Sequence, residues 1–276
     1  MIRLAVRVRR EQAELVLAEL LDLAPSGVEE VDGDGVVEYA VYGVPGELPT
    51  LPDLRAAAGE ALVGVSTTEI ADDWRERWRS YHRPVVVGER LTVRPPWEPP
   101  ASTPLEVVID PGQAFGTGAH ASTRLCLELL LDIPAAGSLL DLGCGSGVLA
   151  IAAARLGFAP VIAVDNDPAA VAATTANAAR AGVHLEVRRL DLRSDPLPEA
   201  DAVTANLVAP LLERWAADLA RATHQPGRII AGGILGSEAD SVAAAFLAAG
   251  LRETRRGERA GWAALQLEPA REECSN

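Results

Sequence analysis

The chain has 276 residues, 49% of them hydrophobic, and a formal net charge of −14. This length allows two domains of about 100 to 200 residues, each with its own core. The excess of negative charge disfavours direct binding to nucleic acid. No run of about 18 apolar residues is present that could cross a membrane, so we expect a cytoplasmic protein.

The numbers of cysteine and lysine residues exclude several types of site and mechanism. The three cysteines, Cys126, Cys144 and Cys274, are widely spaced and odd in number, which favours free thiols and predicts no metal site. The sequence contains no lysine. Schiff-base and P-loop mechanisms, which depend on lysine, are therefore excluded.

Residues 1–70 are predicted to form a small domain with the order βαββαβ, typical of a ferredoxin-like α+β fold. Its elements are expected at 1–9, Glu11–Leu23, Val28–Val31, Val36–Tyr42, Leu54–Glu60 and Ala61–Ile70. The segment holds 5 arginines against 13 acidic residues, a net charge of −8. That charge either keeps the domain soluble or attracts a basic partner.

Residues 71–104 are interpreted as a connection between two domains. Asp72–Tyr81 is rich in tryptophan and arginine and is predicted to be helical. Short strands are expected at Val85–Val87 and Leu91–Val93, ahead of the proline-rich segment Pro95–Pro100. The helix either packs on the following domain or serves as a flexible arm.

Residues 105–268 are predicted to form an α/β domain with a parallel sheet covered on both faces, because apolar strands alternate with helices. After an apolar segment at Leu105–Ile109, seven strands are expected at Leu139–Leu142, Pro160–Val164, Leu185–Val187, Asp201–Leu207, Gly227–Ala231, Leu251–Arg255 and Trp262–Leu267. The last two form a closing hairpin. Residues 269–276 are interpreted as a tail.

A glycine-rich turn, Asp141-Leu142-Gly143-Cys144-Gly145-Ser146-Gly147, joins the strand at Leu139–Leu142 to a helix that begins near Val148. A dinucleotide fingerprint would need a third glycine where Val148 stands. The turn instead resembles the first motif of S-adenosylmethionine-dependent methyltransferases. By itself the turn does not decide between these two ligands.

Polar residues at the ends of later strands favour a nucleotide-type ligand. Asp165 ends the second strand, 24 residues after Asp141, where an acid accepts hydrogen bonds from ribose hydroxyls. Asp167 precedes Pro168 and is expected to cap the next helix. Asp191 is either an acceptor for an adenine amino group or a solvated acid. Asn206, at the end of the fourth strand, is expected to contact the reacting groups, to cap the next helix, or both.

The loop from Asp110 to Thr123 contains three glycines, a phenylalanine and several hydroxyl side chains. It could be a simple connection from strand to helix. Its length and its lack of buried apolar residues favour a loop that contacts a ligand.

Residues 72–267 resemble the PrmA family, the methyltransferases of large-subunit ribosomal protein eleven. The resemblance rests on Asp73-Trp74 with Trp78, on the loop Asp110-Pro111-Gly112 to Phe115-Gly116-Thr117-Gly118, on the motif from Asp141 to Gly147 with Leu149–Ala152, and on Ala205-Asn206-Leu207. It implies a seven-stranded Rossmann-like class I methyltransferase domain. It also implies that Thr123, Gly143 and Asp165 bind S-adenosylmethionine together with Gly145 and Asn206, while Phe115, Thr117 and Gly118 close over it.

One departure concerns the loop. The family usually continues Thr-His-Pro-Thr-Thr, whereas this chain has Ala119-His120-Ala121-Ser122-Thr123. Thr123 is kept, but the rigidity of the proline is lost. The expected consequence is intact cofactor binding with altered positioning of the substrate.

The resemblance implies methylation of lysine side chains and the N-terminal amine of a basic ribosomal protein by a monomeric enzyme. Asn206 would orient the amine as the catalytic residue, and His120 either accepts a proton or makes a structural hydrogen bond. One alternative is a methyltransferase of a small-molecule amine or of another protein. A ligand-binding regulator that uses a dinucleotide is a non-enzymatic alternative.

Overall fold

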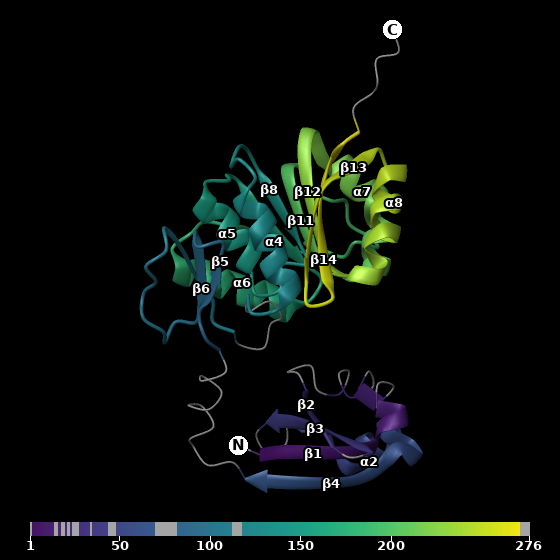
Figure 1. Cartoon of the computed structure of the whole chain (residues 1–276). Helices are drawn as coiled ribbons and strands as arrows, with labels where there is room; N and C mark the ends of the chain where they lie inside the picture. The colour runs from purple at the N-terminus through teal and green to yellow at the C-terminus, as the bar shows by residue number, and fades with distance from the viewer. Residues whose placement is uncertain are drawn as a thin grey trace. The chain divides into compact units, whose positions relative to one another are not determined.

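The computed structural model describes residues 2–13, 16, 17, 20, 23, 28–33, 35–43, 48–69, 82–111 and 118–270. The chain divides into two compact units, which meet in sequence between Tyr81 and His82 (Figure 1). Each unit has its own sheet and core. The predicted helix at Asp72–Tyr81 lies outside the described residues.

The first unit contains a four-stranded antiparallel sheet in the order β2-β3-β1-β4. Its strands are β1 (Ile2–Arg9), β2 (Glu29–Asp32), β3 (Val36–Gly43) and β4 (Leu62–Glu69), with short 3-10 turns η1 (Arg10–Gln12) and η2 (Gly59–Ala61). Alternate residues of β1 are buried against Tyr39 and Leu54. Ala13, Val16 and Leu20, the buried described residues of the predicted first helix, join the same core.

Helix α2 (Leu51–Ala58) begins three residues earlier than the predicted helix at Leu54–Glu60. Pro52 lies in the first turn of the helix, where proline is compatible with helical structure because no backbone N–H is needed there. Thr50 caps this helix: its backbone N–H donates to the Asp53 carboxylate at 2.9 Å, and its side chain accepts from Asp53.

The second unit begins with a three-stranded sheet of β5 (Val85–Val87), β6 (Leu91–Arg94) and β7 (Leu105–Val108). β5 is antiparallel to β6, and β6 is parallel to β7. The apolar segment near Leu105 thus pairs with strands that the sequence placed in a connection, and not with the large sheet. Val93 and Val107 are buried in the same core as the helices described next.

The large sheet has the strand order β10-β9-β8-β11-β12-β14-β13. The strands are β8 (Leu139–Leu142), β9 (Val161–Asp165), β10 (Glu186–Arg189), β11 (Ala200–Asn206), β12 (Thr223–Leu235), β13 (Leu251–Arg259) and β14 (Trp262–Pro269). The first five in this order are parallel, and β14 is antiparallel to both of its neighbours. The fold is therefore an α/β fold with a mixed sheet.

Helices cover both faces of this sheet (Figure 1). α4 (Ala121–Leu131), α5 (Val148–Leu156) and α6 (Pro168–Ala181) contribute to one core, and α7 (Ala209–Ala222) and α8 (Ala239–Ala248) contribute to the other. The short turn η3 (Gly236–Glu238) precedes α8 and has no buried residue. Leu139 belongs to the first core and Leu140 to the second. Because successive strand residues face opposite sides, a strand buried on both faces is continuously apolar.

Among the described residues, no helix is both long and apolar enough to cross a lipid bilayer.

Candidate active site

A pocket lies where β8, β9, β10 and β11 end. Its lining includes Gly143, Gly145, Asp165, Asn206 and Thr123, five of the predicted site residues. The chain connects β8 to β9 in one direction along the sheet and later returns to place β11 on the other side of β8. Ligands of open α/β sheets bind at such a reversal, outside the carboxyl ends of the strands.

The glycine turn brings backbone to the surface of the pocket. Gly143 has φ 72°, and a side chain there would lie 2.6 Å from the Leu207 side chain. The backbone N–H groups of Gly143 and Cys144 donate to the Val164 carbonyl at 2.9 and 3.0 Å. Thr174 donates to the Gly145 carbonyl at 2.9 Å. These bonds fix the turn against β9 and α6, so a ligand meets a backbone surface that is already in place.

Asp141 is a buried residue whose carboxylate supports the glycine turn. Its carboxylate accepts from Thr204 Oγ1 at 2.6 Å and from the Ala150 backbone N–H at 3.1 Å, and the residue is 1% exposed. Burial raises the pKa of Asp141 to about 6, although the two hydrogen bonds favour the ionised form.

Because the pKa of Asp141 is raised in the folded state, the folded protein binds more protons than the unfolded chain between about pH 4 and pH 6. This residue therefore makes folding less favourable as the pH rises through that range. A shift of two pKa units corresponds to about 3 kcal/mol. In Asp141→Asn the amide oxygen can accept from the Ala150 N–H while the amide nitrogen donates to the Thr204 hydroxyl, so we expect this variant to gain up to about this much stability relative to the natural chain as the pH rises from 4 to 7. Urea unfolding of both proteins at several pH values tests this prediction. A difference in free energy of unfolding that does not change with pH would contradict it.

Asp165 stands at the end of β9 and lines the pocket. One carboxylate oxygen accepts from the Gly145 N–H and the other from the Asp167 N–H, both at 3.0 Å. Each oxygen keeps a second lone pair, so the carboxylate can still receive hydroxyl donors. Asp167 caps α6 by accepting from the Ala169 N–H at 2.8 Å, which confirms its predicted role.

Asn206 and Thr123 come together from β11 and α4. Asn206 Nδ2 donates to Thr123 Oγ1 at 3.2 Å. The residue that caps α7 is Val208, so the alternative role of Asn206 as the helix cap is wrong. A side chain on Gly233 would lie 3.0 Å from Asn206 Oδ1 and 2.6 Å from the Leu207 carbonyl. The absence of a side chain at Gly233 therefore leaves room for the Asn206 amide, a role that sequence reasoning missed.

The loop ahead of α4 is described only at its end. Phe115 and Thr117 lie outside the described residues. Gly118 packs closely on β6, since a side chain there would lie 2.8 Å from Val93, and it is absent from the pocket lining.

His120 caps α4. Its Nδ1 accepts from the Ser122 N–H at 3.3 Å, and its ring lies edge-on to Trp262 with 4.6 Å between centroids. Burial lowers the pKa of His120. The structural hydrogen bond expected of this histidine is therefore present.

The pocket extends beyond Asp165 to Asp191, for which a contact with the ligand was one of two predicted roles, and to Arg193, Arg214 and Trp215, which the sequence did not connect with a site. Asp191 and Arg193 follow β10, and Arg214 and Trp215 lie on α7. The Arg214 guanidinium carbon is 5.5 Å from the centre of the Trp215 ring. Charged and aromatic residues on an amphipathic helix are ordinary, so no sequence signal marked these positions as part of a site.

Cys126 and Cys144 are free and buried, and burial raises the pKa of the Cys144 thiol to about 12. Within the described part of the chain, no group of three or more His, Cys, Asp or Glu could hold a metal ion.

The family model described as "Ribosomal protein L11 methyltransferase (PrmA)" matches residues 53–269. The chain belongs to this family. The predicted resemblance is thereby confirmed. Family membership makes the chain a methyltransferase with S-adenosylmethionine as its cofactor.

Curated members of the L11 methyltransferase family are similar to this chain in sequence. The protein from Pelotomaculum thermopropionicum is 36% identical over 299 residues, which cover 96% of this chain and 97% of that protein. The one from Symbiobacterium thermophilum is 42% identical over 197 residues, which cover 70% of this chain but only 65% of that protein. Both are named ribosomal protein L11 methyltransferase.

A solved structure supports the fold of the L11 methyltransferase family for this chain. The ribosomal protein L11 methylase from Lactobacillus delbrueckii subsp. bulgaricus superimposes with a TM-score of 0.63 and 24% identity, covering 69% of this chain and all of that one. At this identity the match bears on the fold alone. It agrees with the α/β sheet described above.

Proposed function

We propose that this protein transfers methyl groups from S-adenosylmethionine to amines of ribosomal protein L11, namely lysine side chains and the N-terminal amine. The observation that carries the proposal is one pocket that joins the glycine turn and Asp165 to the Asn206–Thr123 pair. Related chains of similar length carry the name of this activity. A ribosomal substrate also supports the expected cytoplasmic location.

The pocket residues fit S-adenosylmethionine in kind and position. Gly143 and Gly145 present backbone to the ligand, and Asp165 holds a carboxylate whose orientation two N–H groups fix. We assign Asp165 to the ribose hydroxyls, Gly143 and Gly145 to the amino acid portion, and Thr123 and Asn206 to the end of the pocket where the methyl group would lie. Phe115, Thr117 and Gly118 remain a family-based prediction for closure.

The mechanism requires orientation more than acid or base chemistry. The bound cofactor supplies a methyl group already activated by the positive sulfonium. Asn206 Oδ1 can accept a hydrogen bond from a neutral amine and leave the nitrogen lone pair free to attack. Because Nδ2 is held by Thr123, the amide does not rotate freely. Fixing the amine in this way can contribute several kcal/mol of barrier lowering, on the order of a proximity effect.

We assign recognition of the protein substrate to the first unit, as a ferredoxin-like domain. The antiparallel order β2-β3-β1-β4 with α2 supports that fold. Its sequence charge of −8, from 5 arginines and 13 acids, complements the positive charge that ribosomal proteins commonly carry. Residues 71–104 would connect it to the methyltransferase domain at 105–268, with 82–104 packed on that domain.

Removal of residues 1–81 should separate substrate recognition from cofactor binding. We expect kcat/KM for L11 to fall about hundredfold, because the front unit no longer raises the local concentration of substrate. Binding of S-adenosylhomocysteine to residues 82–276 should change by less than about twofold, since the pocket lies in the second unit. Methylation assays and calorimetry measure the two quantities. Unchanged turnover of L11 would show that recognition lies elsewhere.

A second candidate function is methylation of a small-molecule amine or of another protein. Mass spectrometry of ribosomal proteins from cells with and without this enzyme decides between the two. We expect mass increases in multiples of one methylene on L11 alone. If L11 is unmodified in both cells, the substrate assignment is wrong while the cofactor assignment stands. Titration with NAD tests the regulator hypothesis and should show no binding.

A further inference from the structure

Part of the pocket lining is apolar. Leu192, Leu207 and Leu211 belong to this part together with Trp215. These side chains come from the loop after β10 and from the β11–α7 segment. The same lining contains Asp191, which follows Leu190 just after β10. Apolar and aromatic side chains together with an acid suit a heterocyclic base that carries an amino group.

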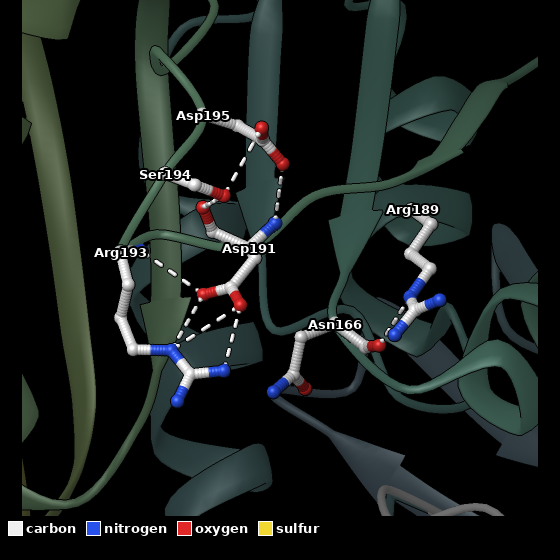
Figure 2. A network of polar contacts seen from close by, with 6 residues as sticks. All are labelled: Asn166, Arg189, Asp191, Arg193, Ser194 and Asp195. Atoms are coloured by element: carbon white, nitrogen blue, oxygen red, sulfur yellow. Dashed lines mark hydrogen bonds and ion pairs between the residues drawn. The ribbon is translucent and has the colours of Figure 1, made fainter.

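Arg193 holds the carboxylate of Asp191 through several hydrogen bonds. Its Nε lies 3.0 and 3.2 Å from the two carboxylate oxygens, and Nη2 donates to Oδ2 at 2.7 Å. The Arg193 backbone N–H also donates to Oδ1 at 3.0 Å. Figure 2 shows the Arg193 guanidinium directed at the Asp191 carboxylate.

The turn that carries this pair is held by bonds that do not involve the guanidinium. The Asp191 N–H donates to the Asp195 carboxylate at 2.8 Å, and the Asp195 N–H returns to the Asp191 carbonyl at 2.8 Å. Removing the Arg193 side chain would therefore leave the backbone of the turn in place. What changes is the orientation of the carboxylate, which is ionised at neutral pH with or without the guanidinium.

We propose that Arg193 is a positioning residue that fixes the Asp191 carboxylate to accept a hydrogen bond from the exocyclic amino group of adenine, and thereby selects adenine over a base with a carbonyl oxygen at that place. This inference rests on the proposed cofactor. An ionised carboxylate accepts from an amino group and repels a carbonyl oxygen. A bidentate guanidinium restricts the carboxylate to one orientation, so the selectivity depends on Arg193 although Asp191 makes the contact.

Calorimetry on the full chain tests the proposal with two ligands: S-adenosylhomocysteine and S-inosylhomocysteine, in which a carbonyl oxygen replaces the amino group. We expect Arg193→Ala to weaken binding of the adenine ligand about tenfold, the size of one charge-assisted hydrogen bond. Binding of the inosine ligand should change by less than about twofold. The selectivity ratio of the natural chain then falls about tenfold.

Arg221→Ala is a matched control. Arg221 pairs with Asp218 on α7, and the two side chains are 71% and 36% exposed, against 74% and 35% for Arg193 and Asp191. Neither Arg221 nor Asp218 lines the pocket. The Arg221 variant should bind both ligands as the natural chain does.

Three outcomes would overturn the role of Arg193 while the natural chain still binds the adenine ligand. Equal weakening of both ligands would show a general effect on the site, unchanged binding would show no effect, and tighter binding would show that Arg193 competes with the base. If the natural chain binds neither ligand, the proposed function fails as well. This failure is distinguishable from failure of the role of Arg193, because it is observed with the natural chain alone.

Discussion

Replacing Asp165 by alanine should weaken the binding of S-adenosylmethionine by at least about hundredfold. A charged acceptor contributes about 1.5–3 kcal/mol per hydrogen bond, and a ribose diol can make two such bonds to one carboxylate. The variant also loses the acceptor for the Gly145 and Asp167 N–H groups, so the glycine turn loses part of its support. At about 1.4 kcal/mol per tenfold, two bonds account for the expected loss. Calorimetry with S-adenosylhomocysteine measures it.

Asp167→Ala is the control for Asp165→Ala. It removes an acid two residues further on, which caps α6 and does not line the pocket. The control should lower the free energy of unfolding by about 1 kcal/mol and leave the dissociation constant within about twofold. If Asp165→Ala binds the ligand as tightly as Asp167→Ala does, the ribose assignment is incorrect.

The parts of the site that could be predicted are those whose residues are determined by a short stretch of sequence. The turn after Leu142 needs residues without side chains, and Gly143 shows why, since Leu207 occupies the space that a side chain would fill. Asp165 could be located because an apolar strand ends in an acid at a fixed distance from the turn. Both signals are contained in short segments, and the carboxyl ends of parallel strands converge on one edge.

Features that depend on pairing between distant segments could not be predicted in the same way. β6 and β7 pair in parallel across the proline-rich segment, and no local pattern distinguishes that pairing from two strands in a connection. Arg193, Arg214 and Trp215 reach the pocket because the loop after β10 and the helix α7 lie on either side of it. Their residue types are equally common on solvated surfaces. The start of α2 differs from the prediction for another reason, because a proline can end a helix or stand in its first turn, as Pro52 does.

Replacing Asn206 by alanine should lower kcat about hundredfold while changing the dissociation constant of S-adenosylhomocysteine by less than about fivefold. A group that orients the reacting amine acts on the chemical step, and loss of one such polar contact commonly costs about 3 kcal/mol in the transition state. The cofactor retains the glycine turn and Asp165, which are supported by bonds independent of Asn206. Single-turnover methylation of L11 and calorimetry give the two quantities separately.

The Thr123 hydroxyl provides the matched variants for Asn206. Thr123→Ser keeps the oxygen that accepts from Asn206 Nδ2 and should preserve most of kcat. Thr123→Val keeps the shape but removes the acceptor, so the amide can rotate and kcat should fall about tenfold, less than for loss of the amide itself. A loss of kcat that increases from Thr123→Ser through Thr123→Val to Asn206→Ala is expected only if Asn206 is oriented by its hydrogen bond to Thr123. If both Thr123 variants match the natural chain while Asn206→Ala loses activity, Asn206 acts without being held by Thr123. If Asn206→Ala loses affinity for S-adenosylhomocysteine and kcat/KM by the same factor, Asn206 serves cofactor binding alone.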